Sequence, residues 1–312
     1  MSTAQARASS AAQPSLTRYA WMSIGAAILT IGLKGWAFLL TGSVGLLSDA
    51  AESLVNLVAA VIALVALTVA ARPADDSHQY GHGKAEYFSA GIEGLMIFVA
   101  AAIILVEAVN RLLNPQPLER LGVGLLITLV ATAINGALGM LLLRRGREHR
   151  SAALVADGKD LMTDVWTSAG VIIGVALVGL TGWQPLDSLV AIGVAINILI
   201  VGTRLVVEST SNLLDAALTA ADIAEIRGAL EPYRSDDVSF HALQTRASGR
   251  QRFVSFHVLV PGDWTVQQAH DLVETVEGDV RARLEGVQVT THVEPREDER
   301  SYDDYDFDGS SG

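Results

Sequence analysis

The chain has 312 residues, of which half are hydrophobic, and its formal net charge is −12. It contains no cysteine, which excludes disulfide bonds and thiolate metal ligands and leaves His, Asp, Glu, Asn or backbone oxygen to bind any metal. The strong negative charge argues against nucleic acid as a partner.

Long apolar stretches are concentrated before about residue 210. A helix needs roughly 20 apolar residues to cross a bilayer. We therefore predict six transmembrane helices, at 17–40, 46–71, 87–110, 120–144, 152–181 and 187–208. The polar ends of the chain, 1–16 and the acidic 297–312, are predicted to be disordered.

Basic residues are distributed unevenly among the connections between these stretches. The loops 41–46 and 182–187 carry no basic residue, and loop 111–120 carries two arginines and one acid. The opposite side carries Arg18, Arg72, Lys84, Arg144, Arg145, Arg147 and Arg150. Because basic loops stay in the cytoplasm, we predict a multi-pass protein of a bacterial inner (plasma) membrane with both termini in the cytoplasm.

Polar residues interrupt the second and fifth apolar stretches. An ionisable residue within a membrane span is costly and is therefore a candidate for function. In "LLSDAAESLVNLV" the spacing i, i+3, i+4, i+7 places four of them on one helix face: Asp49, Glu52, Ser53 and Asn56. In "LVADGKDLMTDVW" three acids share a face in the same way: Asp157, Asp160 and Asp164.

Two carboxylate faces in separate spans can surround a cation, which would offset their mutual repulsion and the cost of burying them. The alternative is that the helix ends are hydrated and the acids face water, above all Asp49 and Asp157, which lie near predicted ends. A proton relay alone would also use carboxylates, but it would not need Asn56.

The connection between the second and third stretches reads "PADDSHQYGHGKAE" and contains two of the seven histidines. It is typical of a metal site, a pH sensor or a solvated turn. His78 and His82 could converge on one ion if the loop were helical, but Gly81 and Gly83 make a regular helix unfavourable there.

Residues 209–296 have the pattern of a small α+β domain. The segment "TAADIAEIRGALEPY" predicts a helix with Thr219 as its N-cap. "VSFHALQTRA" and "QRFVSFHVLV" alternate as strands joined by Ser-Gly, "TVQQAHDLVETVEGDVRARLEG" has helical periodicity, and "VQVTTHVEP" is a strand. The order α-β-β-α-β indicates one sheet with two helices. His292 and Glu294 would share one face of the last strand and could bind one ion together.

These residues give the chain a resemblance to the cation diffusion facilitators over residues 17–296. The resemblance implies a helical transmembrane domain at 17–208 and a metallochaperone-like (ferredoxin-like) cytoplasmic domain at 209–296, in a homodimeric divalent-metal/proton antiporter. It also implies a transport site with two residues four apart in each of two spans: Glu52, Asn56, Asp160 and Asp164.

The expected transport site departs from the pattern of the zinc transporters in this family. Those proteins usually have His or Asp in the second-span pair and His followed by Asp in the fifth span. Here no histidine is present, and Asn56 stands where Asp is usual. Because carboxylate and amide oxygens suit harder ions than imidazole does, we expect Mn²⁺, Fe²⁺ or Co²⁺ as the cargo, with Zn²⁺ as a further candidate.

The resemblance implies further sites outside the spans. The loop site would consist of Asp75, His78 and His82. A binuclear regulatory site in the cytoplasmic domain would use His241, His257, His270, His292 and Glu294. A salt bridge from Lys84 to Asp215 would connect the two domains, and Asp49 and Asp157 would be accessory to the transport site.

The predicted function is efflux of a divalent transition-metal cation in exchange for protons by alternating access in the lipid bilayer. The alternative is a membrane-anchored metal sensor or storage protein that binds metal without transporting it. An enzyme is not expected, because a motif such as H-E-x-x-H is lacking and an all-oxygen site lacks the imidazoles usual in catalytic zinc sites.

Overall fold

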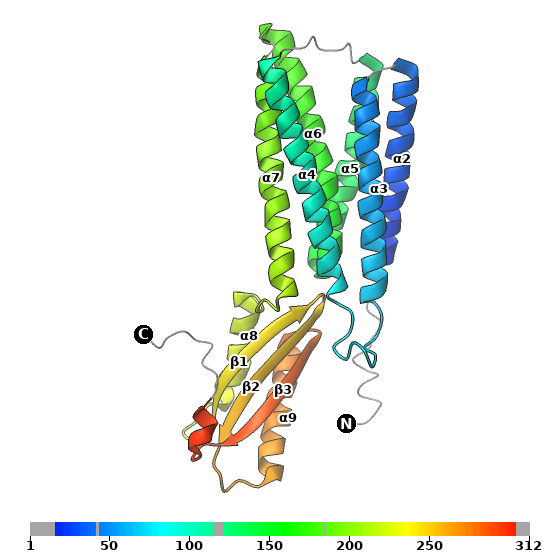
Figure 1. Ribbon diagram of the computed structural model, residues 1–312. Coiled ribbons are helices and arrows are strands. Elements are labelled where there is room, and N and C mark those ends of the chain that lie inside the picture. Colours follow the sequence, from blue (N-terminus) through cyan, green and yellow to red (C-terminus); the bar gives the residue numbers. More distant parts are fainter. Residues whose placement is uncertain (1–15, 42–43, 115–121, 184, 304–312) are drawn as a thin grey trace. The chain divides into compact units, whose positions relative to one another are not determined.

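The computed structural model describes residues 16–303, apart from 42–43, 115–121 and 184. The chain divides after Leu213 into two compact units, a helical unit and a smaller α+β unit (Figure 1).

Long helices make up most of the described part of the helical unit. They are α2 (Thr17–Thr41), α3 (Val44–Ala70), α4 (Ala85–Leu113), α5 (Gly122–Glu148), α6 (Ala152–Thr181) and α7 (Pro185–Leu213). Each coincides with a predicted apolar stretch, and most ends differ by a few residues because the last turn of a helix is not fixed by apolarity. Among the described residues, two helices are long and apolar enough to cross a membrane, Ala85–Leu113 and Ser188–Leu213.

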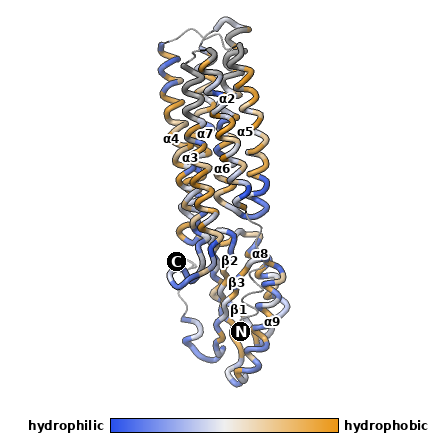
Figure 2. The backbone as a smooth tube through the Cα atoms, turned by 90° about the vertical axis from the view of Figure 1, so that its right-hand side faces the viewer, coloured by the Kyte–Doolittle hydropathy of each residue, from blue (hydrophilic) through white to orange (hydrophobic). Residues whose placement is uncertain are grey.

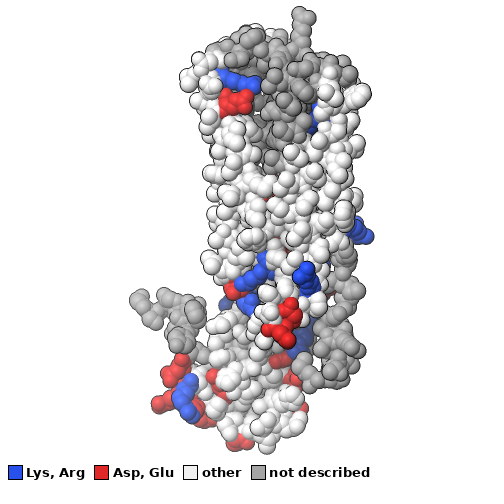
Figure 3. All heavy atoms as spheres, turned by 45° about the vertical axis from the view of Figure 1, so that its right-hand side comes forward, with Lys and Arg blue, Asp and Glu red and all other residues white. Residues whose placement is uncertain are grey.

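The outer surface of this unit is apolar. Large hydrophobic side chains such as Ile103, Val106 and Leu180 are exposed, and hydrophobic residues recur along the coloured parts of the helices (Figure 2). On the face that Figure 3 shows, charged atoms are concentrated toward the ends of the helices. An exposed apolar surface of this extent is expected of helices that face lipid.

Close helix pairs fix the positions of the buried polar residues. α5 packs along α6, α4 along α7, and α2 along α3. A Cβ atom added to Gly158 would lie 2.9 Å from the backbone nitrogen of Leu143, and one added to Gly202 would lie 2.9 Å from that of Phe98. These glycines therefore allow the backbones to approach as small residues do in membrane helix pairs, and Gly158 does so in the same turn of α6 as the predicted acids.

The α+β unit follows the predicted order. It contains α8 (Ala220–Leu230), β1 (Ser239–Ser248), β2 (Gln251–Val260), α9 (Val266–Arg283) and β3 (Val287–Pro295), with short 3₁₀ turns at Glu231–Tyr233 and Glu299–Tyr302. Thr219 is the N-cap of α8, as predicted, and its side chain accepts the N–H of Asp222. The sheet order is β1-β2-β3, antiparallel between β1 and β2 and parallel between β2 and β3.

One face of this sheet is covered by the helices. Val254, Phe256 and Val258 of β2 pack in one core with Ile226 of α8 and Val276 of α9. Side chains alternate between the faces of a strand, so His257 belongs to the opposite face. The histidine positions of the sheet are therefore separated from the hydrophobic core.

Candidate functional site

Buried polar side chains lie on α3 and α6 within the helical unit. Asn56 Nδ2 on α3 donates a hydrogen bond of 2.5 Å to Asp164 Oδ2 on α6. Asp160 is buried one turn before Asp164. Glu52 lies on α3 one turn before Asn56, and its side chain, like that of Asp49, lies outside the described part of the structure. The fold thus brings Asn56 and Asp164 into contact, with Asp160 on the same side of α6.

A second amide, which the sequence pattern did not single out, joins this group. Asn135 on α5 is 2% exposed, and its Nδ2 donates to Asp164 Oδ2 at 3.0 Å. One carboxylate oxygen therefore accepts hydrogen bonds from amides on two other helices. The indication in the sequence was an amide inside the fourth apolar stretch, since a polar group within a membrane span needs a partner.

A further buried acid was also missed. Glu93 on α4 is 1% exposed, accepts a hydrogen bond of 3.0 Å from Ser89 Oγ, and interacts electrostatically with Asp157 and Asp160. Asp157 is itself buried, and its Oδ1 accepts a hydrogen bond of 2.9 Å from Ser23 Oγ on α2. The Asp157 side chain therefore does not face water as the hydrated alternative would have it, because it is buried in contact with Ser23 of α2. Glu93 is an ionisable residue within the third apolar stretch, so the rule applied to the other spans identifies it.

The loop before α4 brings Asp75, His78 and His82 together. His78 Nδ1 lies 3.4 Å from Asp75 Oδ1, and His82 Nε2 lies 3.4 Å from Asp75 Oδ2. One ligand atom from each residue lies within 4.8 Å of the others. The loop is not a regular helix, as expected. Gly81 has a φ of 81°, a left-handed conformation that favours glycine, and this turn directs His82 back toward Asp75.

Backbone groups hold the Asp75 carboxylate in place. The N–H of His78 donates to Asp75 Oδ1 at 2.7 Å and that of Ser77 at 2.9 Å. The hydrogen bond from His78 is the main cause that lowers the pKa of Asp75, so this carboxyl group is ionised at neutral pH, as a metal ligand must be. Nδ1 of His82 is buried and has no hydrogen-bond partner among the described residues.

Lys84 and Asp215 have contacts within their own units. Lys84 Nζ donates to the carbonyl oxygen of Leu213 at 3.0 Å, at the C-terminal end of α7, where a cation is favoured by the helix dipole. Asp215 Oδ1 lies 3.3 Å from Arg246 Nη1. The predicted salt bridge between Lys84 and Asp215 stays a prediction.

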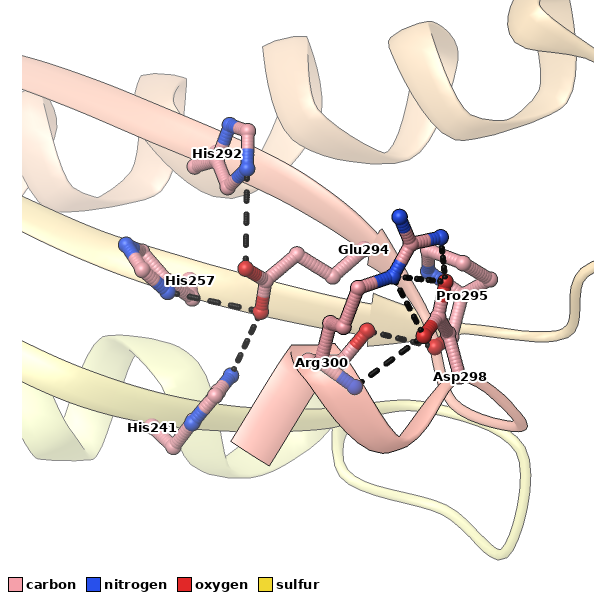
Figure 4. Close-up of polar contacts among 8 residues, drawn as sticks. His241, His257, His292, Glu294, Pro295, Asp298 and Arg300 are labelled. Atoms are coloured by element: carbon pink, nitrogen blue, oxygen red, sulfur yellow. Dashed lines mark hydrogen bonds and ion pairs between the residues drawn. The ribbon is translucent and has the colours of Figure 1, made fainter. Parts of the chain in front are cut away.

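A row of histidines crosses the sheet of the α+β unit. His241, His257 and His292 occupy matching positions on β1, β2 and β3, and all three rings face Glu294 (Figure 4). The distances to the Glu294 carboxylate are 3.0 Å from His241 Nε2, 3.3 Å from His257 Nδ1 and 3.5 Å from His292 Nε2. Ligand atoms of His241, His257 and Glu294 lie within 4.8 Å of one another.

The fifth residue predicted for this site, His270, lies elsewhere. It is exposed on α9, the helix that covers the opposite face of the sheet, and it is not part of the group of close ligand atoms. Within one chain the structure therefore assembles the histidine row and Glu294 but does not bring His270 to them. Its role as a ligand stays a prediction.

Comparison with known proteins assigns the chain to a family. A model of the cation efflux transmembrane domain matches residues 20–214, and a model of the cytoplasmic domain of cation efflux proteins matches residues 218–296. The chain belongs to the cation diffusion facilitator family. Proteins of this family are membrane transporters that export cations, and they are not enzymes.

Relatives match over almost their whole length. The uncharacterized transporter sll1263 of Synechocystis sp. is 53% identical over 91% of this chain and 92% of its own. The cation-efflux pump FieF of Klebsiella pneumoniae is 32% identical over 88% of this chain and 90% of its own. Among solved structures, the metal-bound C-terminal domain of the CzcD transporter from Thermotoga maritima is 24% identical, with a TM-score of 0.24, and covers 26% of this chain and 98% of that chain.

Proposed function

We propose that this cation diffusion facilitator exports a divalent transition-metal cation from the cytoplasm in exchange for protons. The observation that carries the proposal is the buried group of Asn56, Asp160 and Asp164, in which an amide from α3 contacts a carboxylate from α6. Glu52 would complete the group as its fourth member. Such costly side chains inside membrane helices mark the path of an ion.

The ligand chemistry supports Mn²⁺, Fe²⁺ or Co²⁺ as cargo, with Zn²⁺ as a competitor. The proposed transport residues offer only carboxylate and amide oxygens, and hard oxygen ligands suit these ions better than they suit Zn²⁺. Zn²⁺ would still compete by its higher intrinsic affinity for most sites. Protons that enter from the far side would neutralise the carboxylates and release the ion.

The proposal includes a topology and an assembly. The six long helices would all cross a bacterial inner membrane, and both termini would lie in the cytoplasm. The loop residues Asp75, His78 and His82 and the histidine row with Glu294 would bind regulatory metal. Metal on the cytoplasmic domains of a homodimer would draw the protomers together, and a salt bridge between Lys84 and Asp215 would transmit this change.

Metal flux in proteoliposomes tests the transport site. The wild-type protein should carry Mn²⁺ or Zn²⁺ when a proton gradient is applied, and the D160A/D164A variant should lose this flux. Glu107→Ala is the matched control, because Glu107 is an exposed acid on α4 paired with Arg111. Full flux in the D160A/D164A variant would contradict the site assignment. Metal binding without flux in the wild type would favour the sensor or storage alternative.

A further inference from the structure

The two ends of the Asn135 amide have different surroundings. Its Nδ2 donates to Asp164 Oδ2, and its Oδ1 is buried with no hydrogen-bond partner among the described residues. Most buried polar atoms in proteins have a partner. A buried amide oxygen without a hydrogen bond, on a side chain whose other end contacts a buried carboxylate, is suited to a cation because it is a neutral hard ligand.

The helix packing holds Asn135 firmly at this place. Gly136, the next residue of α5, faces Val165 of α6, where an added Cβ would lie 3.5 Å from a Val165 methyl group. One turn further, a Cβ at Gly139 would lie 3.3 Å from the carbonyl oxygen of Gly158. α5 therefore lies closely against the segment of α6 that carries the acids, which keeps the backbone of Asn135 beside Asp164.

Hydrogen bonding and cation coordination compete at Asp164. Oδ2 of this residue accepts from Asn135 and from Asn56, and a cation on the same oxygen would repel both NH₂ groups. A carboxamide has a donor at one end and an acceptor at the other. A half-turn about its terminal bond exchanges them, so the amide can hold the carboxylate at one stage of the transport cycle and bind the cation at the next.

We propose that Asn135 is a fifth member of the transport site, whose amide oxygen binds the cation and helps to select it. This inference rests on the proposed function and adds α5 to the helices that supply ligands. With Asn56, it makes two of the five ligands neutral oxygens. A site of carboxylates and amides with no imidazole favours ions such as Mn²⁺ over ions that prefer nitrogen.

Mn²⁺ binding to Asn135 variants tests this inference. The full-length protein is used with the other sites removed by H78A, H82A, H241A and H257A, and free Mn²⁺ is followed by its EPR signal. Asn135→Leu removes both ends of the amide and should weaken Mn²⁺ binding roughly tenfold or more. Asn135→Asp keeps an oxygen but loses the donor, and it should bind Mn²⁺ at least as tightly as the parent. Asn110→Leu, on the exposed surface of α4, is the control and should bind normally.

The binding measurements decide whether the oxygen of Asn135 is a ligand of the cation. If Asn135→Leu binds Mn²⁺ like the parent, or if Asn135→Asp binds as weakly as Asn135→Leu, the oxygen of Asn135 is not a ligand. If Asn135→Leu does not fold, as judged by thermal unfolding, Asn135→Asp is compared with the parent, and weaker Mn²⁺ binding than in the parent would contradict the assignment. Parallel flux measurements separate this inference from the proposed function. Parent protein without flux, combined with weak binding in Asn135→Leu, would refute transport and leave the ligand assignment intact.

Discussion

Asp164 is the residue at which three helices meet. It belongs to α6, and its carboxylate accepts hydrogen bonds from Asn56 on α3 and Asn135 on α5. One turn before it lies Asp160, at the position where the resemblance to zinc transporters leads us to expect histidine. The side chain at position 160 therefore determines whether the site offers an imidazole. Imidazole is a better ligand for Zn²⁺ than for Mn²⁺.

Replacing Asp160 by histidine should shift the choice of ion. D160H is expected to raise transport of Zn²⁺ relative to Mn²⁺, on the order of tenfold, which corresponds to about 1.4 kcal/mol. The ratio of the two fluxes in proteoliposomes measures the effect. Glu107→His places the same side chain on an exposed position of α4 and should leave the ratio unchanged. An unchanged ratio in D160H as well would refute the argument from ligand hardness.

Removing His82 should abolish metal binding at the loop. His82→Ala deletes the buried Nδ1 and the Nε2 atom beside Asp75, so the purified protein should retain less metal after gel filtration, measured by elemental analysis. His149→Ala is the control, because His149 lies at the end of α5 with its Nδ1 bonded to the Arg145 carbonyl oxygen. Equal metal content in the two variants would show that the loop histidines are not ligands.

At the scale of elements, the sequence predicted where helices and strands lie but not how they meet. Apolar length located α2 to α7, and alternation located β1 to β3. Asn135 and Glu93 are polar residues within predicted spans and could have been identified as candidates, but their contacts with Asp164 and with the acids of α6 could not, because apolar length does not show which helices pack together. Strand β1 has a register shift between His241 and Gln244, where Ala242 has a φ of 49°. The strict alternation of side chains from which the strand was predicted does not reveal such an irregularity.

The helix α9 begins with a capping box. The Thr265 side chain accepts the N–H of Gln268, and the Gln268 side chain accepts the N–H of Thr265. Thr265→Ala should cost about 1 kcal/mol, which corresponds to about fivefold faster hydrogen exchange in the first turn of α9 if opening there is local. Thr275→Ala, later on the same helix, removes only a bond to the Asp271 carbonyl oxygen and should leave that turn unchanged. Equal protection of the first turn in wild type and Thr265→Ala would contradict the cap's contribution.

At the scale of the whole molecule, metal on the cytoplasmic domain is expected to control how two protomers associate. Glu294 is the residue on which this expectation depends, since all three histidines of the row face its carboxylate. The carboxylate is what turns three imidazoles on three strands into one site. Without the Glu294 carboxylate, the three histidines would have no common partner.

Glu294→Ala should therefore abolish any effect of metal on the spacing of the two cytoplasmic domains. Energy transfer between dyes on the α+β units of the full-length protein should rise when Zn²⁺ is added to the wild type and stay constant in Glu294→Ala. Glu274→Ala, an exposed acid on α9, should behave like the wild type. A metal response that persists in Glu294→Ala would place the regulatory site elsewhere.

If the histidine row binds metal as proposed, binding would depend on the correct register of the strands. His257 on β2 and His292 on β3 are direct neighbours in a parallel pair. A slip of one residue would turn His292 and Glu294 toward the helix-covered face. Only the correctly paired sheet can then hold the ion, so metal uptake by newly made protein would selectively stabilise molecules whose strands have assembled in register.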